Sequence, residues 1–257
     1  MFINIKNLNF RYNKNLPNTI SDLSLYIKEG TITVLLGLNG CGKTTLIKLL
    51  AGLLKYEDGL IEYDEKDLRK INIRDRSKIF SYVPQKTYIA DDFFVKDYLT
   101  YGFVNVLKFY ETPKKEHLDK IQALSEELGI TYLLEKKMGK ISGGERQIVT
   151  IASCLLQNTP IILLDEPTSA LDLRNQYTVL TALKKIASEG KTIILSSHNP
   201  NHALFLESQV ALMDNGSIVK TGYSTEFINI DLLKDIYGDS ICYSDDLPYQ
   251  EITFKSI

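Results

Sequence analysis

Two segments near the amino terminus, Ile3 to Tyr12 and Thr19 to Gly30, alternate apolar and polar residues. A period of two predicts strands that bury one face and leave the other in water, as antiparallel strands do. The next segment, Thr31 to Gly37, is a short continuous apolar run that ends in glycine, which predicts a buried strand. Helical spacing follows from Lys43 to Leu54. We therefore expect an antiparallel pair of strands, then a buried strand that leads into a helix.

Helical periodicity replaces the strand patterns in the middle of the chain, from about residue 90 to residue 157. The clearest helix is expected over residues 114–130, where the apolar residues follow the three-four spacing of an amphipathic helix: Leu118, Ile121, Leu124 and Leu128. Buried strands return at Ile161 to Asp165 and at Thr192 to Ser197, with a helix between them from Asn175 to Ser188. The middle of the chain is therefore predicted to be a helical insertion in a core of strands and helices.

Strands that alternate with helices predict an α/β fold with a mostly parallel central sheet. The pattern adds an N-terminal antiparallel β-subdomain and an inserted α-helical subdomain at about 90–157. The expected main domain spans residues 1–222, and residues 223–257 form a short C-terminal extension. This extension is predicted to hold one short helix over residues 225–238 and weak strand patterns after it.

Composition and charge narrow the class of protein. The formal charge of −2 gives no support to nucleic-acid binding, which usually needs a basic domain or stripe. No apolar run approaches the roughly 18 residues that a membrane span needs, and the amino terminus does not resemble a signal peptide. We therefore expect a cytoplasmic protein that reaches a membrane only through a partner. Cys41, Cys154 and Cys242 are odd in number and far apart, which excludes a disulfide framework and predicts reduced thiols.

The run GLNGCGKT, from Gly37 to Thr44, matches the pattern G-x-x-x-x-G-K-[ST] between a strand and a helix. Glycines let backbone N–H groups approach phosphate oxygens, and the start of the helix adds partial positive charge. Lys43 is expected to reach the β- and γ-phosphates of ATP, and the Thr44 hydroxyl to hold Mg²⁺. A chance match in a glycine-rich turn has a probability on the order of one per cent. The pattern predicts a P-loop NTPase core that binds nucleotide through Gly37, Leu38, Asn39, Gly40, Cys41, Gly42, Lys43, Thr44 and Thr45.

Two carboxylates follow a later buried strand, in the segment IILLDEP. The apolar residues deliver Asp165 to the end of this strand, where P-loop proteins coordinate Mg²⁺. Glu166 stands beside it, although the strand itself needs no second carboxylate. A general base must lie within hydrogen-bond reach of the water that it activates, so Glu166 is the candidate base. The alternative is a solvated acidic turn ahead of Pro167, which the phosphate loop makes the weaker interpretation.

The segment ISGGERQ, from Ile141 to Gln147, resembles the signature motif of ABC-type ATPases, and it precedes the Asp165 strand as it does in that family. Ser142 and the glycines after it cap a helix start with exposed N–H groups, which makes an anion site. The resemblance implies that two chains pack head to tail and complete each other's ATP sites. The signature residues expected at ATP are Ser142, Gly143, Gly144 and Glu145.

Further elements occur in the family's order. The resemblance implies that Gln85 belongs to the glutamine loop, which senses Mg²⁺ and faces the transmembrane partner. It likewise implies that His198 contacts the γ-phosphate and that Tyr12 stacks on adenine. The stretch from Ser169 to Asp172 matches a loop that crosses the dimer interface. The implied catalytic residues are Glu166, His198, Lys43 and Gln85, and the implied Mg²⁺ ligands are Thr44, Gln85 and Asp165.

Two departures from the family pattern bear on coupling rather than on ATP binding. Ile141 stands where the family usually has leucine, which is a mild change in volume. Ser153 and Cys154 stand where the family commonly has an arginine followed by a small residue. The missing arginine removes a structural or coupling contact.

The branch of the family is indicated by the segments LDLRNQ and HNPNHAL, which begin at Leu171 and His198, and by a tail helix ending in IYG. They resemble the ATPases of importers for iron-siderophore complexes, haem and cobalamin. Such importers use an integral membrane permease and an extracytoplasmic substrate-binding protein. The resemblance implies an ATPase that is peripheral on the cytoplasmic face of the membrane and dimerises with a second copy of itself. Ordinary helix-entry chemistry is the alternative explanation of Asp172 and Asn199.

Other classes of protein stay open. A soluble non-transport ABC ATPase, for example one that serves iron-sulfur assembly, would have soluble partners. A nucleic-acid-associated ABC ATPase usually carries a coiled-coil insertion, zinc cysteines or a second ATPase half, and the sequence contains no sign of these. A P-loop kinase leaves the signature motif and His198 unexplained. An exporter subunit is also possible, although exporters more often fuse this domain to their membrane span.

Overall fold

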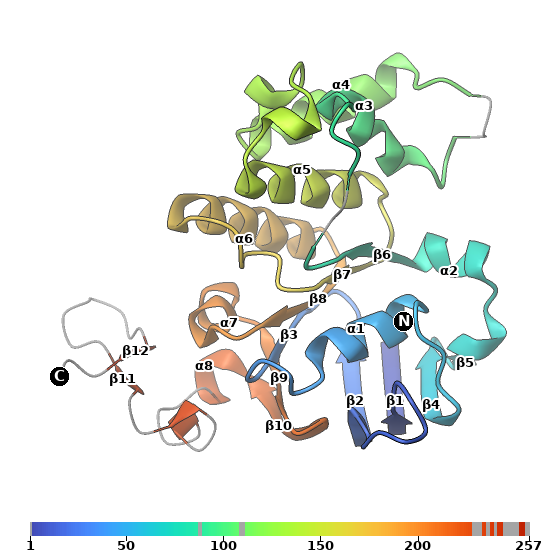
Figure 1. Cartoon of the computed structure of the whole chain (residues 1–257), viewed down its shortest axis with the longest axis vertical. Helices are drawn as coiled ribbons and strands as arrows, with labels where there is room; N and C mark the ends of the chain where they lie inside the picture. The colour runs from blue at the N-terminus through green and yellow to red at the C-terminus, as the bar shows by residue number, and fades with distance from the viewer. Residues whose placement is uncertain are drawn as a thin grey trace. The chain divides into compact units, whose positions relative to one another are not determined.

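The chain forms two compact units (Figure 1). The first unit comprises residues 1–71 and 194–257, and the second comprises residues 72–193. The computed structural model describes residues 2–86, 89–107, 111–227, 233–234, 237–238, 241–243 and 252–254. The expected boundaries, namely a main domain over 1–222 with a helical subdomain at about 90–157 and an extension over 223–257, stay a prediction.

An antiparallel sheet with the strand order β2-β1-β4-β5 lies in the first unit. Its strands are β1 (Phe2–Phe10), β2 (Ile20–Lys28), β4 (Asp58–Tyr63) and β5 (Lys66–Asp67). The register between β1 and β2 shifts between Ile5 and Leu8, where Asn7 takes a positive φ. This bulge lets Ile3, Ile5 and Leu8 all point into the core despite their irregular spacing. The expected antiparallel pair is confirmed.

A second sheet of the first unit follows the order β10-β9-β3-β8. Its strands are β3 (Ile32–Leu36), β8 (Thr192–Ser197), β9 (Gln209–Asp214) and β10 (Ser217–Tyr223), and β8 enters this unit at Ile194. The strand β3 pairs in parallel with β9 and is buried throughout, as its continuous apolar run predicts. The helices of this unit include α1 (Lys43–Ala51), α7 (Pro200–Leu206), α8 (Ser224–Phe227) and the 3-10 turn η1 (Leu68–Lys70).

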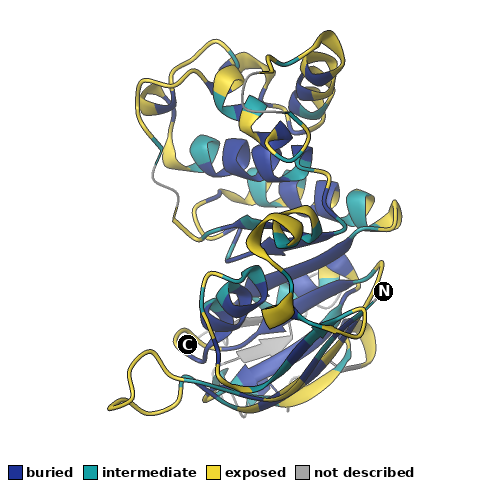
Figure 2. Ribbon diagram, turned by 90° about the vertical axis from the view of Figure 1, so that its right-hand side faces the viewer, coloured by how far each residue is buried: buried dark blue, intermediate teal, exposed yellow. Residues whose placement is uncertain are grey.

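The second unit combines a parallel strand pair with the helices expected in the middle of the chain. The pair is β6 (Phe80–Val83) with β7 (Ile161–Leu164). The helices are α2 (Ile73–Ile79), α3 (Val95–Thr100), α4 (Lys115–Glu127), α5 (Gly143–Leu156) and α6 (Leu173–Ser188), with 3-10 turns η2 (Tyr101–Phe103), η3 (Thr131–Leu133) and η4 (Met138–Lys140). The helix α5 packs against α3, α4 and η2, and Figure 2 shows it largely buried. The helical insertion and the α/β fold are confirmed.

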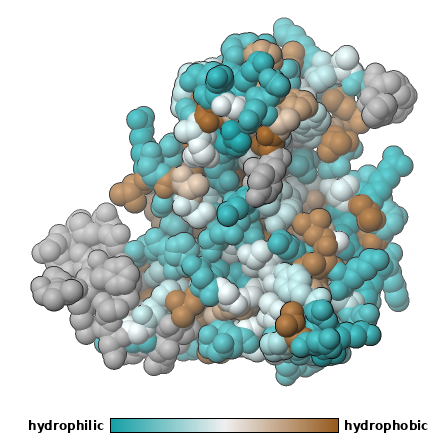
Figure 3. Space-filling view, in the orientation of Figure 1, coloured by the Kyte–Doolittle hydropathy of each residue, from teal (hydrophilic) through white to brown (hydrophobic). Residues whose placement is uncertain are grey.

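The tail agrees with its weak sequence patterns as far as the structure describes it. The helix α8 begins at Ser224, and the rest of the helix expected up to residue 238 lies mostly outside the described residues. The strands β11 (Ile241–Tyr243) and β12 (Ile252–Phe254) pair antiparallel. Within the described ranges, no helix has both the length and the apolar character to cross a bilayer. Figure 3 shows apolar side chains scattered among polar ones on the face in view.

The helix α4 differs from its predicted stripe at one position. Ile121 and Leu128 are buried, whereas Leu118 is 52% exposed. The buried face begins instead with His117, whose ring centroid lies 4.6 Å from that of Phe103. The Lys114 N–H also donates to His117 Nδ1 at 2.9 Å, so the histidine both packs and satisfies a helix-start donor. The expectation that Leu118 belongs to the buried stripe was wrong because His117 occupies that place.

Two alanine substitutions one turn apart on α4 test this packing. We expect Ile121→Ala to lower the free energy of unfolding by about 2–5 kcal/mol, because it leaves a cavity beneath the helix. Leu118→Ala is the matched control and should change it by no more than about 0.5 kcal/mol. Urea unfolding followed by circular dichroism measures both. Equal destabilisation by the two variants would contradict this orientation of α4.

Candidate functional site

The loop between β3 and α1 is shaped by close approaches that only glycine permits. A Cβ on Gly37 would lie 2.3 Å from the carbonyl oxygen of Met213, and Gly42 has a φ of +108° with Ile20 close by. The Gly216 N–H donates to the carbonyl oxygen of Cys41 at 3.0 Å and so ties the loop to the turn after β9. Close contacts therefore hold the backbone of the predicted phosphate loop at both ends. Gly40 lies in the open middle of the loop, where an added Cβ would meet nothing within 4 Å.

Lys43 lies inside the curve of this loop. Its Nζ donates to the carbonyl oxygens of Gly37 and Leu38 at 2.7 and 2.9 Å, and the residue is buried. The helix α1 begins here at Gly42 without a side-chain cap and without an acidic residue in its first turn. By contrast, α5 and α6 are each capped by a side chain, from Ser142 and Asp172. The first turn of α1 thus combines a cation with a helix start that has no side-chain cap, which suits a phosphate chain.

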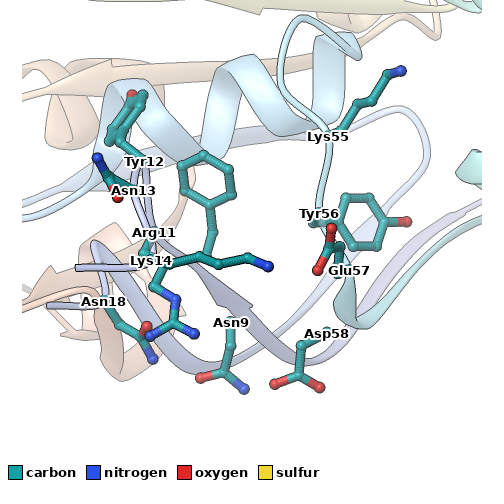
Figure 4. A pocket seen from close by; sticks show the side chains of 11 residues that line it. Asn9, Arg11, Tyr12, Asn13, Lys14, Asn18, Lys55, Tyr56, Glu57 and Asp58 are labelled. Carbon is teal, nitrogen blue, oxygen red and sulfur yellow. The ribbon is translucent and has the colours of Figure 1, made fainter. Parts of the chain in front are cut away.

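Tyr12 lies beside the start of α1. Its hydroxyl is 3.1 Å from Thr45 Oγ1, and its ring centroid lies 5.1 Å from that of Phe10 in an edge-to-face arrangement. The ring is 54% exposed and borders a pocket of about 380 Å³ (Figure 4). The pocket is lined by Asn9, Phe10, Arg11, Tyr12, Asn13, Lys14, Asn18, Lys55, Tyr56, Glu57 and Asp58. The first unit therefore presents an aromatic face next to the phosphate loop, as stacking on a base requires.

The carboxyl ends of β6 and β7 bring the next group of predicted residues together in the second unit. Val83 pairs with Leu164 in parallel, so the segments that follow both strands leave the same edge. The Asp165 N–H donates to the carbonyl oxygen of Val83 at 2.9 Å, and Asp165 is 1% exposed. Gln85 Nε2 donates to Glu166 Oε2 at 3.0 Å across 81 residues of sequence. The predicted base is thus held by the predicted glutamine-loop residue.

Glu166 has an unusual backbone conformation. Its φ is +46°, in the left-handed region that non-glycine residues rarely occupy. The hydroxyl of Ser169 donates to the Glu166 carbonyl oxygen at 3.0 Å and closes the turn. Such strain costs about 1–3 kcal/mol and concentrates at functional sites. Sequence reasoning missed this contact, because nothing in the stretch from Ser169 onwards indicates that a serine supports the preceding glutamate.

The signature segment forms the start of α5. The Glu145 N–H donates to Ser142 Oγ at 3.2 Å, while Glu145 Oε2 accepts from the Ser142 N–H at 2.7 Å. The Tyr132 hydroxyl donates to Glu145 Oε1 at 2.8 Å. These donors, the Ser142 N–H first, hold the pKa of Glu145 below its usual value. Ser142 and Gly143 are exposed at the helix start, whereas the Glu145 carboxylate is engaged as a reciprocal cap.

His198 follows β8 directly and is exposed in the first unit. The first unit therefore carries Tyr12, the phosphate loop and His198, and the second carries Gln85, Asp165, Glu166 and the signature segment. Thr19 and the turn from Asp214 to Gly216, which buttress the phosphate loop, were not predicted to contribute to the site. The Asn-Gly dipeptide at 215–216 could have indicated a hairpin, but not its place under the loop.

The residues that depart from the family pattern lie inside the second unit. Ile141, Ser153 and Cys154 are all buried. Burial raises the pKa of the Cys154 thiol to about 12, so this thiol stays protonated at neutral pH. Cys41 and Cys154 are free in the part of the chain that the structure describes, and the reduced state of the thiols stays a prediction.

The chain is similar to known proteins over most of its length. The sequence profile of a family described as ABC transporter matches residues 20–169. A Helicobacter pylori (strain J99) protein described as an iron chelatin transport ATP-binding protein is 33% identical over 96% of this chain and 98% of its own length. The iron(3+)-hydroxamate import ATP-binding protein FhuC of Bacillus subtilis is 32% identical over 85% of this chain and 81% of its own.

A relative with a different substrate and a solved structure extend the comparison. The spermidine/putrescine import ATP-binding protein PotA of Borreliella afzelii is 33% identical over 93% of this chain and 68% of its own length. A structure described as a metal-chelate type ABC transporter in an inward-facing conformation superimposes with a TM-score of 0.80. That match covers 99% of this chain and 96% of the other at 26% identity.

The lowered pKa of Glu145 predicts a pH-dependent contribution to stability. A carboxylate whose pKa is lowered by folding stabilises the protein above its unfolded pKa, about 4.3, and that contribution is lost as the pH falls through the folded pKa. Glu145→Gln should therefore destabilise the protein near neutral pH by no more than about 1 kcal/mol, since the group is partly exposed. The difference should vanish in acid, as measured by urea unfolding at a series of pH values.

Glu189→Gln controls for the loss of one negative charge. Glu189 is the C-cap of α6, where a carboxylate is disfavoured by the helix dipole, so this variant should not destabilise the protein. A stability difference for Glu145→Gln that grows as the pH falls would contradict the assignment.

Proposed function

Because this chain belongs to the ABC transporter family, we propose that it is the ATP-hydrolysing subunit that powers an importer of iron chelates through a membrane permease. The observation that carries the proposal is the phosphate loop, where the Lys43 ammonium group lies within the curve beside the uncapped start of α1. The family accounts for ATP binding and hydrolysis, while the role of each residue, the partner and the substrate are proposed.

ATP is proposed to bind along the loop from Gly37 to Thr45. The backbone N–H groups and the start of α1 would receive the phosphate oxygens, and Lys43 would neutralise the β- and γ-phosphates. Adenine would stack on the exposed ring of Tyr12. Lys43 now donates to two carbonyl oxygens, so phosphate binding exchanges neutral acceptors for charged ones.

Mg²⁺ fits the donor set of the predicted ligands. Thr44, Gln85 and Asp165 offer a hydroxyl, an amide oxygen and a carboxylate, which are the hard oxygen donors that this ion prefers. When bound, the ion would neutralise charge on the phosphate oxygens.

Glu166 is proposed to act as the general base. Its carboxylate would take a proton from a water molecule as the water oxygen attacks the γ-phosphorus, and the bond from that phosphorus to the bridging oxygen breaks. The products are ADP and phosphate. The charge that develops on the transferring group would be met by Lys43 and His198. The Gln85 amide donates to Glu166 Oε2 at 3.0 Å and would hold the carboxylate in place until Gln85 turns to bind Mg²⁺.

A second copy of this chain is the proposed partner across the nucleotide. Ser142, Gly143 and Gly144 present N–H groups at the start of α5, and Glu145 holds that start in shape. A γ-phosphate bound in one chain would accept from these groups of the other. ATP would then join the two copies, and hydrolysis would release them.

The transported substrate is proposed to be an iron-siderophore complex, with haem and cobalamin as related candidates. Relatives described as iron chelatin and iron(3+)-hydroxamate transport proteins support this choice, while a polyamine importer of similar identity makes it worth testing. The subunit would be peripheral on the cytoplasmic face of the membrane and would serve a permease and, through it, an extracytoplasmic binding protein.

Glu166→Gln separates ATP binding from hydrolysis. The variant keeps the hydrogen-bonding shape of the side chain but lacks the base, so we expect ATP to bind with little change while turnover falls by about 10²-fold or more. Size-exclusion chromatography with ATP should reveal a trapped dimer. Glu189→Gln is the control at an exposed carboxylate and should keep wild-type turnover. Near wild-type turnover by Glu166→Gln would show that the base is another group.

Partner capture tests the transport role. We expect the tagged chain, purified from detergent-solubilised host membranes, to bring a multi-helix permease that mass spectrometry identifies. The reconstituted complex should hydrolyse ATP several-fold faster with a binding protein loaded with ferric siderophore than with spermidine, on the order of a coupling free energy of 1–3 kcal/mol.

The other outcomes of this experiment are equally informative. Stimulation of ATP hydrolysis by haem or cobalamin would make one of these the substrate in place of the iron-siderophore complex. Stimulation by spermidine alone would contradict the proposed group of substrates and indicate a polyamine. Recovery only from the soluble fraction with soluble partners would contradict transport and leave a cytosolic ABC ATPase.

A further inference from the structure

His202 lies in the first turn of α7, four residues after His198, and is 8% exposed. Both ring nitrogens face polar groups where β8 ends and α7 begins. Nδ1 is 3.0 Å from Ser197 Oγ, and Nε2 is 3.4 Å from Asn199 Nδ2. Ser197 and Asn199 are the two residues that flank His198 in the sequence. The buried His202 ring therefore contacts both sequence neighbours of the histidine that is proposed to contact phosphate.

The neighbouring hydrogen bonds fix the direction of each contact. Asn199 Oδ1 accepts from the Asn201 N–H at 3.0 Å as the cap of α7, so its Nδ2 is the atom that faces the ring. Because Nδ2 is a donor, His202 Nε2 must accept, and the ring proton must therefore sit on Nδ1. Nδ1–H then donates to Ser197 Oγ, which also accepts from the Asn199 N–H at 3.0 Å and donates to the Asn199 carbonyl oxygen at 3.3 Å.

A second proton on His202 would break this arrangement. Protonated Nε2 would place an N–H against the Nδ2 donor of Asn199, and two donors that face each other repel. Burial, and then the nearby charge of His198, lower the pKa of His202 to about 4, in agreement with this geometry. The ring is therefore neutral at physiological pH and keeps one tautomer.

We propose that His202 is a positioning residue for His198, which it holds through a hydrogen-bonded ring formed by its Nδ1–H, the Ser197 hydroxyl and the Asn199 backbone and side chain. The inference rests on the proposed role of His198 and goes beyond it. His198 itself is exposed, while Ser197 is buried and Asn199 is the N-cap of α7. Anchoring both flanks leaves His198 with few backbone orientations, which reduces the entropy lost when it contacts a phosphate.

A double-mutant cycle on steady-state ATP hydrolysis tests the inference. His202→Phe keeps the size of the ring but removes both nitrogens. We expect it to lower kcat about tenfold and to change KM for ATP by no more than about twofold, as loss of an interaction used in the transition state does. In a His198→Ala background the same change should have almost no further effect, because the two residues act as one unit.

Matched variants keep the test interpretable. His202→Asn places an amide donor where Nδ1 was and should recover kcat to within about threefold of wild type. Ser197→Ala removes the hydroxyl that joins His202 to the Asn199 backbone, so it should lower kcat in the same way as His202→Phe. His117→Phe is the control, since it removes a buried histidine packed on Phe103 in the second unit and should leave kcat unchanged.

Histidine NMR gives a readout that does not depend on activity. The chain has three histidines, so labelled imidazole nitrogens resolve the ring of His202 by comparison with the His202→Asn spectrum. We expect the Nδ1–H tautomer and no titration across about pH 5 to pH 8. A ring that titrates near the usual histidine pKa, or one protonated on Nε2, would overturn the inference.

The outcomes separate this inference from the proposed function. Wild-type turnover by His198→Ala would refute the role of His198 and, with it, this inference. Low turnover by His198→Ala combined with equal losses from His202→Phe in both backgrounds would leave the proposed function intact and assign His202 a structural role only.

Discussion

The Lys43 ammonium group, held by the carbonyl oxygens of Gly37 and Leu38, sets the conditions for the first unit. A buried cation needs acceptors around it, and two backbone carbonyls supply them only if the loop curls tightly. That curl brings Gly37 against Met213. The parallel register of β3 and β9 must therefore place Leu36 beside Leu212, because a slip of one residue would move the buttress away.

In the second unit, the constraint is that two polar side chains, Gln85 and Glu166, lie together where β6 and β7 end. Gln85 and Glu166 follow parallel neighbours, so each strand delivers its residue to the same edge. Glu166, which accepts from Gln85, has a left-handed backbone, and the Ser169 hydroxyl donates to its carbonyl oxygen. The strain falls at the residue proposed as base, where a fixed carboxylate is of more use than a relaxed backbone.

The helices near the candidate site differ in whether a side chain caps the N–H groups at their start. Ser142, Asp172 and Asn199 each cap a helix with their own side chain, and Glu145 adds a reciprocal bond at Ser142. Gly42 contributes no side chain to α1. A start with its own cap has an N–H group already satisfied, as at Asn199 beside His198, whereas a start without a side-chain cap is suited to receive an anionic ligand.

The sequence by itself determined the elements and much of the candidate site. Period-two alternation identified β1 and β2, a continuous apolar run identified β3, and fixed spacing identified the loop ending at Thr44, because these features depend on neighbours in the chain. Even on α4, local periodicity located the helix and failed only at Leu118, where packing on Phe103 favours His117.

Only the tertiary structure decided which distant groups meet. Gln85 donates to Glu166 across 81 residues of sequence, and the Gly216 N–H donates to the Cys41 carbonyl oxygen. The contacts of His202 with Asn199 and Ser197 fix which of its ring nitrogens carries the proton. The physical reason is that hydrogen bonds are short and directional, so their partners are chosen by strand register and by helix orientation. Residue type sets what each side chain can donate or accept, and the fold sets which of these groups come within 3 Å or so of one another.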